Sequence, residues 1–300
     1  MDLALLEDFL ELARELNFSR AAEKRNMTQP AFSRRIRALE DAMRTPLVLR
    51  TTRQVALTPA GKAFQPRAAA IARALADAQR EALEAAGRTQ RSLNLAATHA
   101  LSYTFVPRWL MHVAGPAEVG TLNMVSDTHR QCVDLVQRGE ASFFISHRGP
   151  DTPQDLSERQ FRHHVIGNDR LVPVSAPDAA GRPRWRLATD DGPAPYIGYG
   201  AASGLHAILE SHWVLHGRPD LRQVMSSVLA ATNLEMAKEG QGIAYLPGSL
   251  AERDLDRGRL VPAGDASHHV PVQVVIYRPR SRLSAHCEAF WQKVVSGSAV

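Results

Sequence analysis

The stretch from Phe18 to Leu39 constrains the fold most, because two short helical patterns flank a break at Asn26-Met27-Thr28. We expect Ser19 to cap the first helix and Thr28 the second. Pro30 lies in the first turn of the second helix, where its missing N–H costs nothing. That helix carries an apolar stripe at helical spacing, made by Phe32, Ile36, Leu39 and Met43.

The opposite face of the second helix is basic, with Arg34 and Arg37 pointing outward and Ser33 and Arg35 on the flanks. A helix with its back in a core and arginines outward, entered through a tight turn, is typical of the recognition element of a helix-turn-helix. Its start would enter the major groove of double-stranded DNA, where arginines suit phosphate or guanine. The alternative is an ordinary surface helix with a solvated basic face.

Positive charge is concentrated in the same region. The 300 residues carry a formal charge of +5, and the window from Phe18 to Arg53 holds nine basic and three acidic residues, a charge of +6. The remainder is therefore near −1. One basic module on an otherwise balanced protein indicates a polyanionic partner.

The cysteine count and the hydropathy indicate the cellular compartment. Cys132 and Cys287 are the two cysteines, which suits a reducing cytoplasm and offers no disulfide framework or zinc cluster. The sequence shows no secretory signal pattern and no apolar run of the ~18 residues that a membrane span needs. We therefore predict a soluble, cytoplasmic protein with no membrane partner and no cofactor.

Further elements flank the helix pair. Leu47 to Leu57 predicts a hairpin, or wing, whose tip would place Arg50 and Arg53 near a DNA backbone; a solvated turn is the alternative. From Thr58-Pro59 to about Gly87 an Ala-rich 3–4 spacing predicts a long helix, which Pro66 should bend or start late. Its thin apolar stripe favours dimerisation over the role of an inter-domain spacer.

Beyond Arg91, strands alternate with helices, which predicts parallel sheets. Strands are expected at 93–97, 119–125, 141–145, 170–175, 196–199, 221–225, 242–246 and 270–277. Helices are expected at 103–113, 128–138, 203–216, before 238 and up to about 294. Two linked α/β lobes with a cleft between them are typical of a small-molecule receptor, whose ligands bind at the carboxyl ends of strands.

Several motifs resemble the winged helix-turn-helix of LysR-type transcriptional regulators. They are Asn17-Phe18-Ser19-Arg20-Ala21-Ala22, Thr28-Gln29-Pro30-Ala31-Phe32-Ser33-Arg34-Arg35-Ile36, Leu39-Glu40, Leu47-Val48-Leu49-Arg50 and Leu57-Thr58-Pro59-Ala60-Gly61. Gly240-Gln241-Gly242-Ile243-Ala244-Tyr245-Leu246-Pro247 resembles that family's signature in the second regulatory lobe. The resemblance covers essentially the whole chain.

The resemblance implies an N-terminal all-α winged helix-turn-helix with a long linker helix, and a C-terminal α/β two-lobed effector domain like that of periplasmic binding proteins. The expected domains are 1–58 for DNA binding, 59–88 for the linker and dimerisation helix, 91–164 with 268–300 for regulatory lobe I, and 165–267 for lobe II. The implied partners are double-stranded DNA, a small-molecule effector or an oxidant, further copies of the chain as dimers or tetramers, and RNA polymerase.

The DNA-facing set implied by position comprises Ser19, Thr28, Gln29, Pro30, Ser33, Arg34 and Arg37, with Arg50 and Arg53 in the wing. The chain departs from the family pattern in three places: Arg44 stands where a glycine usually follows the recognition helix, Val48 replaces a wing phenylalanine, and Pro66 lies in the linker helix. A left-handed turn at Arg44 would cost on the order of 1 kcal/mol.

Within the family, Gln29–Glu40 and Thr98–Ser102 look most like a subgroup that answers hypochlorous acid by methionine oxidation. Candidate sensing residues in the regulatory lobes are Met124, Met225 and Met236. Because thioethers usually fill cores, the alternative is that these methionines only pack.

Three strand ends should face the cleft between the lobes. They carry Thr98, His99 and Ser102, then Tyr199, Gly200, Ala201 and Ser203, then Ser226 and Ser227. Hydroxyls and free N–H groups at helix starts suit an anion, so an organic carboxylate is the expected effector. The alternative is that each hydroxyl only caps its helix and that His99 is structural.

Other functions are less well supported. His212 and His216 have a spacing that could hold a metal ion, but no third ligand is evident, so we predict no metal site. An enzyme would need a positioned acid, base or nucleophile pair, and the sequence shows none. The leading hypothesis is a DNA-binding transcriptional regulator, and the alternative is a small-molecule binding protein without a regulatory role.

Overall fold

The computed structural model describes residues 2–50, 55–86, 92–187 and 192–297. The chain divides into two compact units, Met1–Thr89 with Gln137–Glu140, and Gln90–Val136 with Ala141–Val300. No described helix combines the length and the apolar character that crossing a bilayer requires. The expected wing residue Arg53 lies outside the described residues.

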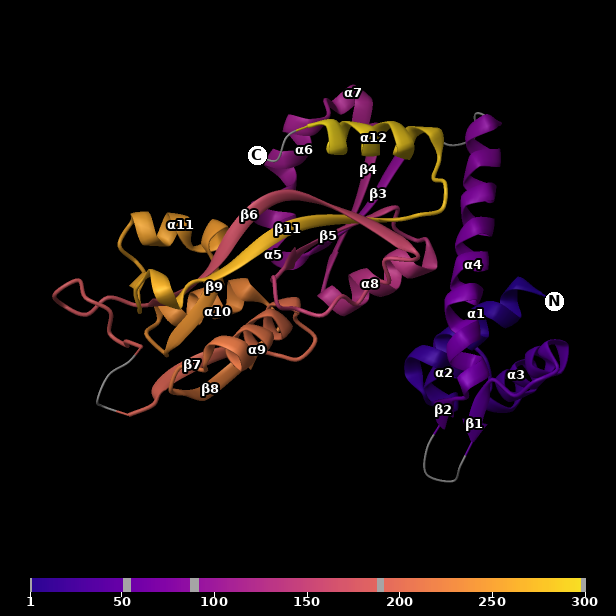
Figure 1. Ribbon diagram of the computed structural model, residues 1–300, viewed down its shortest axis with the longest axis horizontal. Helices are drawn as coiled ribbons and strands as arrows, with labels where there is room; N and C mark the ends of the chain where they lie inside the picture. Colours follow the sequence, from indigo (N-terminus) through magenta and orange to yellow (C-terminus); the bar gives the residue numbers. More distant parts are fainter. Residues whose placement is uncertain (1, 51–54, 87–91, 188–191, 298–300) are drawn as a thin grey trace. The chain divides into compact units, whose positions relative to one another are not determined.

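The first unit begins with three helices around an apolar core. Its elements are α1 (Leu3–Glu15), α2 (Phe18–Lys24), α3 (Gln29–Met43), β1 (Val48–Arg50), β2 (Val55–Leu57) and α4 (Pro59–Ala85) (Figure 1). The predicted stripe of α3 is buried, since Phe32, Ile36 and Leu39 are all 0% exposed. They pack against Phe9 and Leu12 of α1, so α3 has its apolar back in the core as expected.

A buried carboxylate joins the three helices. Asp8 of α1 is 0% exposed and pairs with the guanidinium groups of Arg25 and Arg35. A buried charge is tolerated only when it is paired and hydrogen-bonded. Arg25 and Arg35 are therefore structural residues of the helix-turn-helix.

The helix caps differ from the expectation. Asn17, and not Ser19, caps α2, because its side chain accepts hydrogen bonds from the N–H groups of Ser19 and Arg20, both at 3.0 Å. Thr28 precedes α3 at the N-cap position, but its hydroxyl forms no capping hydrogen bond. The predicted cap at Ser19 therefore lies two residues beyond the observed one. The helix exit at Arg44 is left-handed, with φ 55°.

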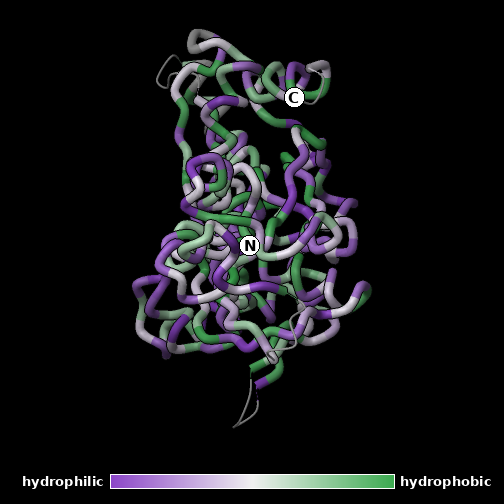
Figure 2. Tube along the Cα trace, turned by 90° about the vertical axis from the view of Figure 1, so that its left-hand side faces the viewer, coloured by the Kyte–Doolittle hydropathy of each residue, from purple (hydrophilic) through white to green (hydrophobic). Residues whose placement is uncertain are grey.

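The wing and α4 complete this unit. β1 and β2 pair antiparallel, with Leu49 opposite Ala56, and both are drawn largely in the green of hydrophobic residues in Figure 2. α4 runs without a break through Pro66, so the expected late start is wrong. Alanines follow this proline, and their high helix propensity offsets the lost hydrogen bond.

The second unit contains one mixed sheet in the order β4-β3-β5-β11-β6-β9-β7-β8, with β10 beside β6. Its strands are β3 (Ser92–Thr98), β4 (Thr121–Asp127), β5 (Phe143–Arg148), β6 (Phe161–Ser175), β7 (Ala194–Tyr199), β8 (Leu221–Ser227), β9 (Ile243–Pro247), β10 (Val261–Pro262) and β11 (Val270–Pro279). We call the part built on β3, β4 and β5 lobe I, and the part built on β7, β8 and β9 lobe II. Within each lobe these strands are parallel, as predicted.

Helices cover both faces of each lobe. They are α5 (His99–Thr104), α6 (Val106–Val113), α7 (Pro116–Val119), α8 (His129–Arg138), α9 (Gly204–His216), α10 (Ala230–Lys238), α11 (Gly248–Asp256) and α12 (Ala285–Ser296), with a short 3₁₀ turn, η1 (Ala266–His268). In lobe I, α6 and α12 share one core and α8 contributes to another. In lobe II, α9 packs on one face of the sheet, and α10 with α11 on the other.

Two long strands connect the lobes. β6 and β11 run side by side and antiparallel through both (Figure 1). β11 also pairs with β5 of lobe I, through residues 273–277, and β6 also pairs with β9 of lobe II, through residues 171–174. The change of lobe therefore falls near Asn168–Leu171 on β6, opposite Val270–Gln273 on β11. This ribbon is the only β-ladder that links the lobes among the described residues.

Candidate functional site

The first candidate surface is the solvent face of α3. Arg34 and Arg37 are exposed, and neither forms a hydrogen bond or an ion pair with another residue that the structure describes. Arg25 and Arg35, in contrast, are committed to Asp8. Two unpaired guanidinium groups on one helix face can bind phosphate or the edge of a guanine.

Arg50 is held between the wing and α3. Its guanidinium donates to Ser33 Oγ at 3.0 Å, pairs with Glu40 Oε2 at 3.3 Å, and lies 4.6 Å from the centre of the Phe18 ring. Glu40 Oε1 also accepts the backbone N–H groups of residues 47 and 48, at 2.9 and 3.0 Å. Glu40 thus fixes the start of β1 against α3, and Arg50 lies beside the predicted DNA-facing residue Ser33.

An exposed apolar stripe follows α4. Ile71 and Leu75 are 45% and 40% exposed, and Ala78 and Ala82 continue the same spacing at exposed positions. Exposed large aliphatic side chains at i, i+4 positions on a long helix are typical of a coiled-coil seam that meets another copy. This stripe lies on the helix that the sequence predicts to dimerise, and its pairing stays a prediction.

The second candidate site is a small cavity of about 30 Å³ where four helices of the second unit begin. Its walls come from the starts of α5, α8, α9 and α10 and from the end of β5. They are Thr98, His99, Ala100, Asp127, Thr128, His129, His147, Ser203, Gly204, Leu205, Val228 and Ala230. Helix starts present free N–H groups and the positive end of the helix dipole, which favours an anion.

Buried polar atoms in this cavity lack partners. Thr98 Oγ1, His129 Nδ1 and His147 Nε2 are buried and form no hydrogen bond with any described residue. Buried polar groups of native proteins are nearly always hydrogen-bonded, and exceptions need an explanation. Three such atoms lining one cavity can hydrogen-bond a polar ligand there.

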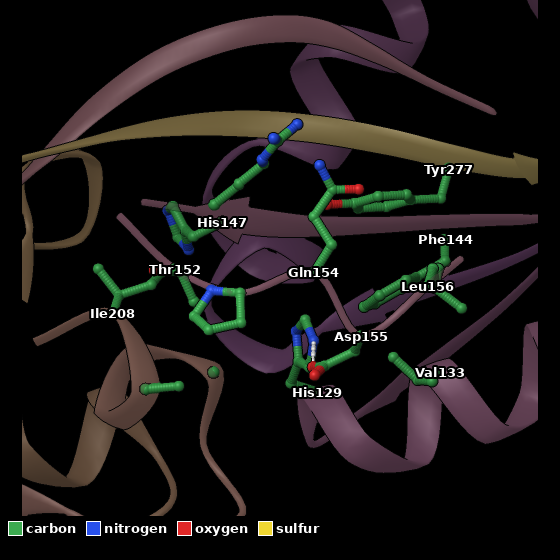
Figure 3. A pocket seen from close by; sticks show the side chains of 14 residues that line it. His129, Val133, Phe144, His147, Thr152, Gln154, Asp155, Leu156, Ile208 and Tyr277 are labelled. Atoms are coloured by element: carbon green, nitrogen blue, oxygen red, sulfur yellow. Dashed lines mark hydrogen bonds and ion pairs between the residues drawn. The ribbon is translucent and has the colours of Figure 1, made fainter. Parts of the chain in front are cut away.

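An adjoining cavity of about 40 Å³ extends the site along lobe I. Figure 3 shows His129 and His147 among the residues that line it, with the hydrogen bond between His129 and Asp155 dashed. His129 Nε2 lies 2.9 Å from Asp155 Oδ2, and this hydrogen bond outweighs burial and lowers the pKa of Asp155. His147 Nε2 lies 3.8 Å from Asp169 Oδ2 on the ribbon that connects the lobes.

Family comparisons match both units. Residues 3–62 match the model for the bacterial regulatory helix-turn-helix protein, lysR family, and residues 86–298 match the LysR substrate binding domain. The chain belongs to the LysR family of transcriptional regulators. The recognition made from the sequence and the predicted two-part fold are confirmed.

Individual LysR regulators align along most of the chain. The HTH-type transcriptional regulator YjiE of Escherichia coli K12 is 28% identical over 289 residues, which is 96% of this chain and 92% of that protein. IlvR of Caulobacter vibrioides is 30% identical over 257 residues, 83% of each. Full-length HypT of Salmonella typhimurium superposes with a TM-score of 0.58 at 28% identity, covering 98% of this chain and 97% of that one. DarR of Vibrio fischeri in complex with DNA superposes at 0.57 with 26% identity, covering 99% of both.

The effector residues predicted for this LysR regulator are only partly brought together. Thr98, His99 and Ser203 line the four-helix cavity. Ser102 lies behind it, where its hydroxyl is 2.8 Å from Ser126 Oγ. Tyr199 is buried in the core of lobe II, and its hydroxyl donates to the carbonyl of Tyr245 at 2.9 Å.

The remaining predicted effector residues of the LysR regulator lie around the cavity without lining it. The Gly200 N–H donates to the Ser227 carbonyl, and Ser227 Oγ accepts the Leu229 N–H at 3.1 Å. Ala201 and Ser226 are exposed. Ser227 therefore has the local, capping-like role that the sequence left open.

Sequence reasoning missed four lobe I residues of the cavity: Asp127, Thr128, His129 and His147. The first three lie where β4 ends and α8 begins, so the rule that ligands bind at strand ends could have found them. His147 gave no such signal, because it lies within β5 and only the fold brings it to the cavity.

The sulfur residues of the LysR regulator are mostly internal. Cys132 and Cys287 are buried free thiols. Met225 and Met236 pack against the core of lobe II. Met124 on β4 is 39% exposed, and Met111 on α6, which the sequence analysis did not single out, is 62% exposed.

Proposed function

We propose that this regulator binds a pseudo-palindromic promoter site as a dimer or tetramer and contacts RNA polymerase there. A small anion in the four-helix cavity would control the arrangement of its DNA-binding domains, which we call heads. Residues 1–58 would bind DNA, 59–88 would pair the heads, and lobes I (91–164 with 268–300) and II (165–267) would hold the effector. The observation that carries the DNA-binding role is that Arg34 and Arg37, exposed on α3, form no hydrogen bond or ion pair within the described part of the chain. The solved complex of the similar DarR with DNA supports the same role.

The DNA-facing proposal has a defined set of residues. Gln29 and Pro30 are exposed at the start of α3, the end of a recognition helix that contacts base edges. Ser33, Arg34 and Arg37 continue that face, and Ser19 and Thr28 flank it at the turn. Arg50 contributes from the wing, next to Ser33.

Fluorescence anisotropy with duplex DNA from upstream of the gene tests this set. Arg34→Ala should cost roughly 1–3 kcal/mol of binding free energy and relax specificity if Arg34 reads a base. Arg222→Ala is the matched control, because Arg222 is an equally exposed arginine on β8 of the other unit. Equal affinity of the Arg34→Ala variant and the control for the upstream DNA would remove Arg34 from the interface.

Pairing through α4 would place two heads on one site. Ile71 and Leu75 present apolar surface that a second α4 would cover. Sedimentation of the Ile71→Asp/Leu75→Asp double variant should give a smaller assembly than the wild type at the same concentration. A footprint on upstream DNA should show half-sites about 10–10.5 base pairs apart, or a multiple of that spacing.

The proposed effector is a small anion, such as a carboxylate of few atoms, because the helix starts and the unpartnered Thr98 and histidine atoms offer donors around a cavity of only about 30 Å³. A thermal-shift titration with acetate, benzoate and chloride tests this class. Carboxylate should raise the melting temperature of the wild type and have a smaller effect on Thr98→Val. Ser226→Ala, outside the cavity, is the control and should respond like the wild type.

An oxidant is the second candidate signal. The similar HypT is described as hypochlorite-specific, and Met124 is exposed on β4 of this chain. Treatment with stoichiometric hypochlorite followed by peptide mass spectrometry should show sulfoxide at Met124 before Met225 and Met236. The oxidant role further requires that Met124→Leu abolish a hypochlorite-induced change in DNA affinity.

A further inference from the structure

Three potential metal ligands from both lobes meet beside the cleft. His212 and His216 lie one turn apart on the last turns of α9, in lobe II. Asp151 lies in the loop that follows β5 of lobe I. α9 approaches this loop closely, since a Cβ atom at Gly149 would lie 3.0 Å from Ile208 Cγ2. Figure 3 shows the next loop residue, Thr152, beside Ile208 of α9.

The distances between the three ligand atoms are close to those found around a bound metal ion. Asp151 Oδ2 lies 3.4 Å from His216 Nε2 and 3.7 Å from His212 Nδ1, and one ligand atom from each residue lies within 4.8 Å of the others. Ligand atoms bound at ~2.0–2.1 Å in a tetrahedral zinc site lie about 3.3–3.4 Å apart. The pair of Asp151 and His216 already has that separation, and the distance from Asp151 to His212, 3.7 Å, is close to it.

Two of the ligand atoms also lack hydrogen-bond partners among the described residues. Asp151 Oδ2 and His212 Nδ1 are buried and form no hydrogen bond with any described residue. A bound metal ion would give both atoms a partner.

We propose that Asp151, His212 and His216 bind a divalent transition-metal ion, with Zn²⁺ the best match. Two imidazoles and one carboxylate suit zinc, and three protein ligands leave a fourth position for water or an exogenous donor. The sequence offered only the histidine pair and predicted no metal site, and the fold supplies the third ligand. Because Asp151 and α9 belong to different lobes, the ion joins the lobes beside the effector cavity.

Calorimetric titration of the EDTA-treated, dialysed full-length protein with ZnCl₂ tests the site without DNA or effector. We expect one Zn²⁺ per chain, with affinity reduced at least tenfold by Asp151→Asn and by His216→Ala. His216 is exposed, so its loss does not threaten the fold. His206→Ala, a histidine variant on the same helix, is the matched control and should bind like the wild type. MgCl₂ should not bind, because Mg²⁺ prefers all-oxygen ligands.

Co²⁺ provides a second readout that reports on geometry. The Co²⁺-loaded wild type should show visible absorption of a four-coordinate ion, and the Asp151→Asn variant should lose it. Two outcomes overturn the proposal: no Zn²⁺ binding by the folded wild type, or Zn²⁺ binding that persists unchanged in both ligand variants. Because the measurement involves no DNA, failure of the DNA-binding proposal would leave the result interpretable.

Discussion

The imidazole of His129, at the start of α8, lies directly against Gly204, the first residue of α9, so the two lobes touch where two helices begin. A Cβ atom at Gly204 would lie 3.0 Å from His129 Nδ1 and 3.1 Å from His129 Cβ. The same two residues line the cavity proposed for the effector. The distance between His129 and Gly204 therefore reports how closely the two lobes approach each other.

Gly204→Ala should lower the free energy of unfolding by about 1–3 kcal/mol, because the added methyl group overpacks against His129. In a His129→Ala background the same change should cost less, because the contact with the ring is gone while the contact with Cβ, at 3.1 Å, remains. Urea unfolding followed by tryptophan fluorescence measures both, because Trp109, Trp185, Trp213 and Trp291 all lie in this unit. An equal cost in the two backgrounds would show that the contact is absent.

Asp8→Ala should destabilise the helix-turn-helix by about 2–4 kcal/mol, because it leaves Arg25 and Arg35 without their shared buried partner. Glu7→Gln is the control: Glu7 pairs with Arg25 from a side chain that is 42% exposed, and its loss should cost less than about 1 kcal/mol. Amide hydrogen exchange of α1–α3 in the full chain gives both values. Similar exchange in the two variants would contradict a structural role for Asp8.

Asp169 should make stability depend on acid pH. Burial would raise its pKa, but the nearby His147 imidazole, 3.8 Å away, and the hydrogen bonds from Ser249 together outweigh burial, so the pKa lies below its ordinary value. A carboxyl group with a depressed folded-state pKa stabilises the fold above its unfolded pKa and loses that contribution as pH falls. The difference in unfolding free energy between the wild type and Asp169→Asn should therefore be constant above about pH 5 and shrink below it. A difference that stays constant down to acid unfolding would exclude the depressed pKa.

The two thiols should be unreactive in the folded protein. Cys132 is 0% exposed and Cys287 is 1% exposed, and burial raises the pKa of Cys132 to about 12. A buried thiol with little thiolate is a poor nucleophile. Ellman's reagent should thus report no fast-reacting thiol in the native protein and two per chain in guanidinium. Rapid labelling of the native protein would reopen a thiol-based redox response.

Local sequence rules predicted the first unit well, because its helices and wing depend on short-range spacing. The stripe of Phe32, Ile36 and Leu39 was enough to orient α3. The errors were also local: Asn17 competes with Ser19 for the cap, and the alanines that follow Pro66 hold α4 together.

Long-range pairing was harder to predict. The first half of β6 was missed because the stretch from Arg162 to His164 is basic and polar, and it forms a strand only because β11 pairs along it. α11, which is nine residues long, was not predicted. Expected helix 103–113 is instead α5 and α6, broken at Phe105 ahead of Pro107.

The same contrast between local and long-range features applies to the candidate sites. Arg34 and Arg37 could be placed on the solvent face of α3 from helical periodicity alone. The approach of His147 to the cavity and of Asp151 to α9 depends on how two lobes close, and no spacing in the sequence encodes that distance.

The central claim, that α3 brings Arg34 and Arg37 to a specific DNA sequence, is tested most directly by comparing the affinity of the full chain for upstream DNA and for a scrambled duplex at ~150 mM salt. The account predicts a preference of at least about 10³-fold for the upstream DNA, largely lost in Arg34→Ala/Arg37→Ala and kept in Arg222→Ala. Equal affinity for the two duplexes, or a preference that survives the double substitution, would contradict it.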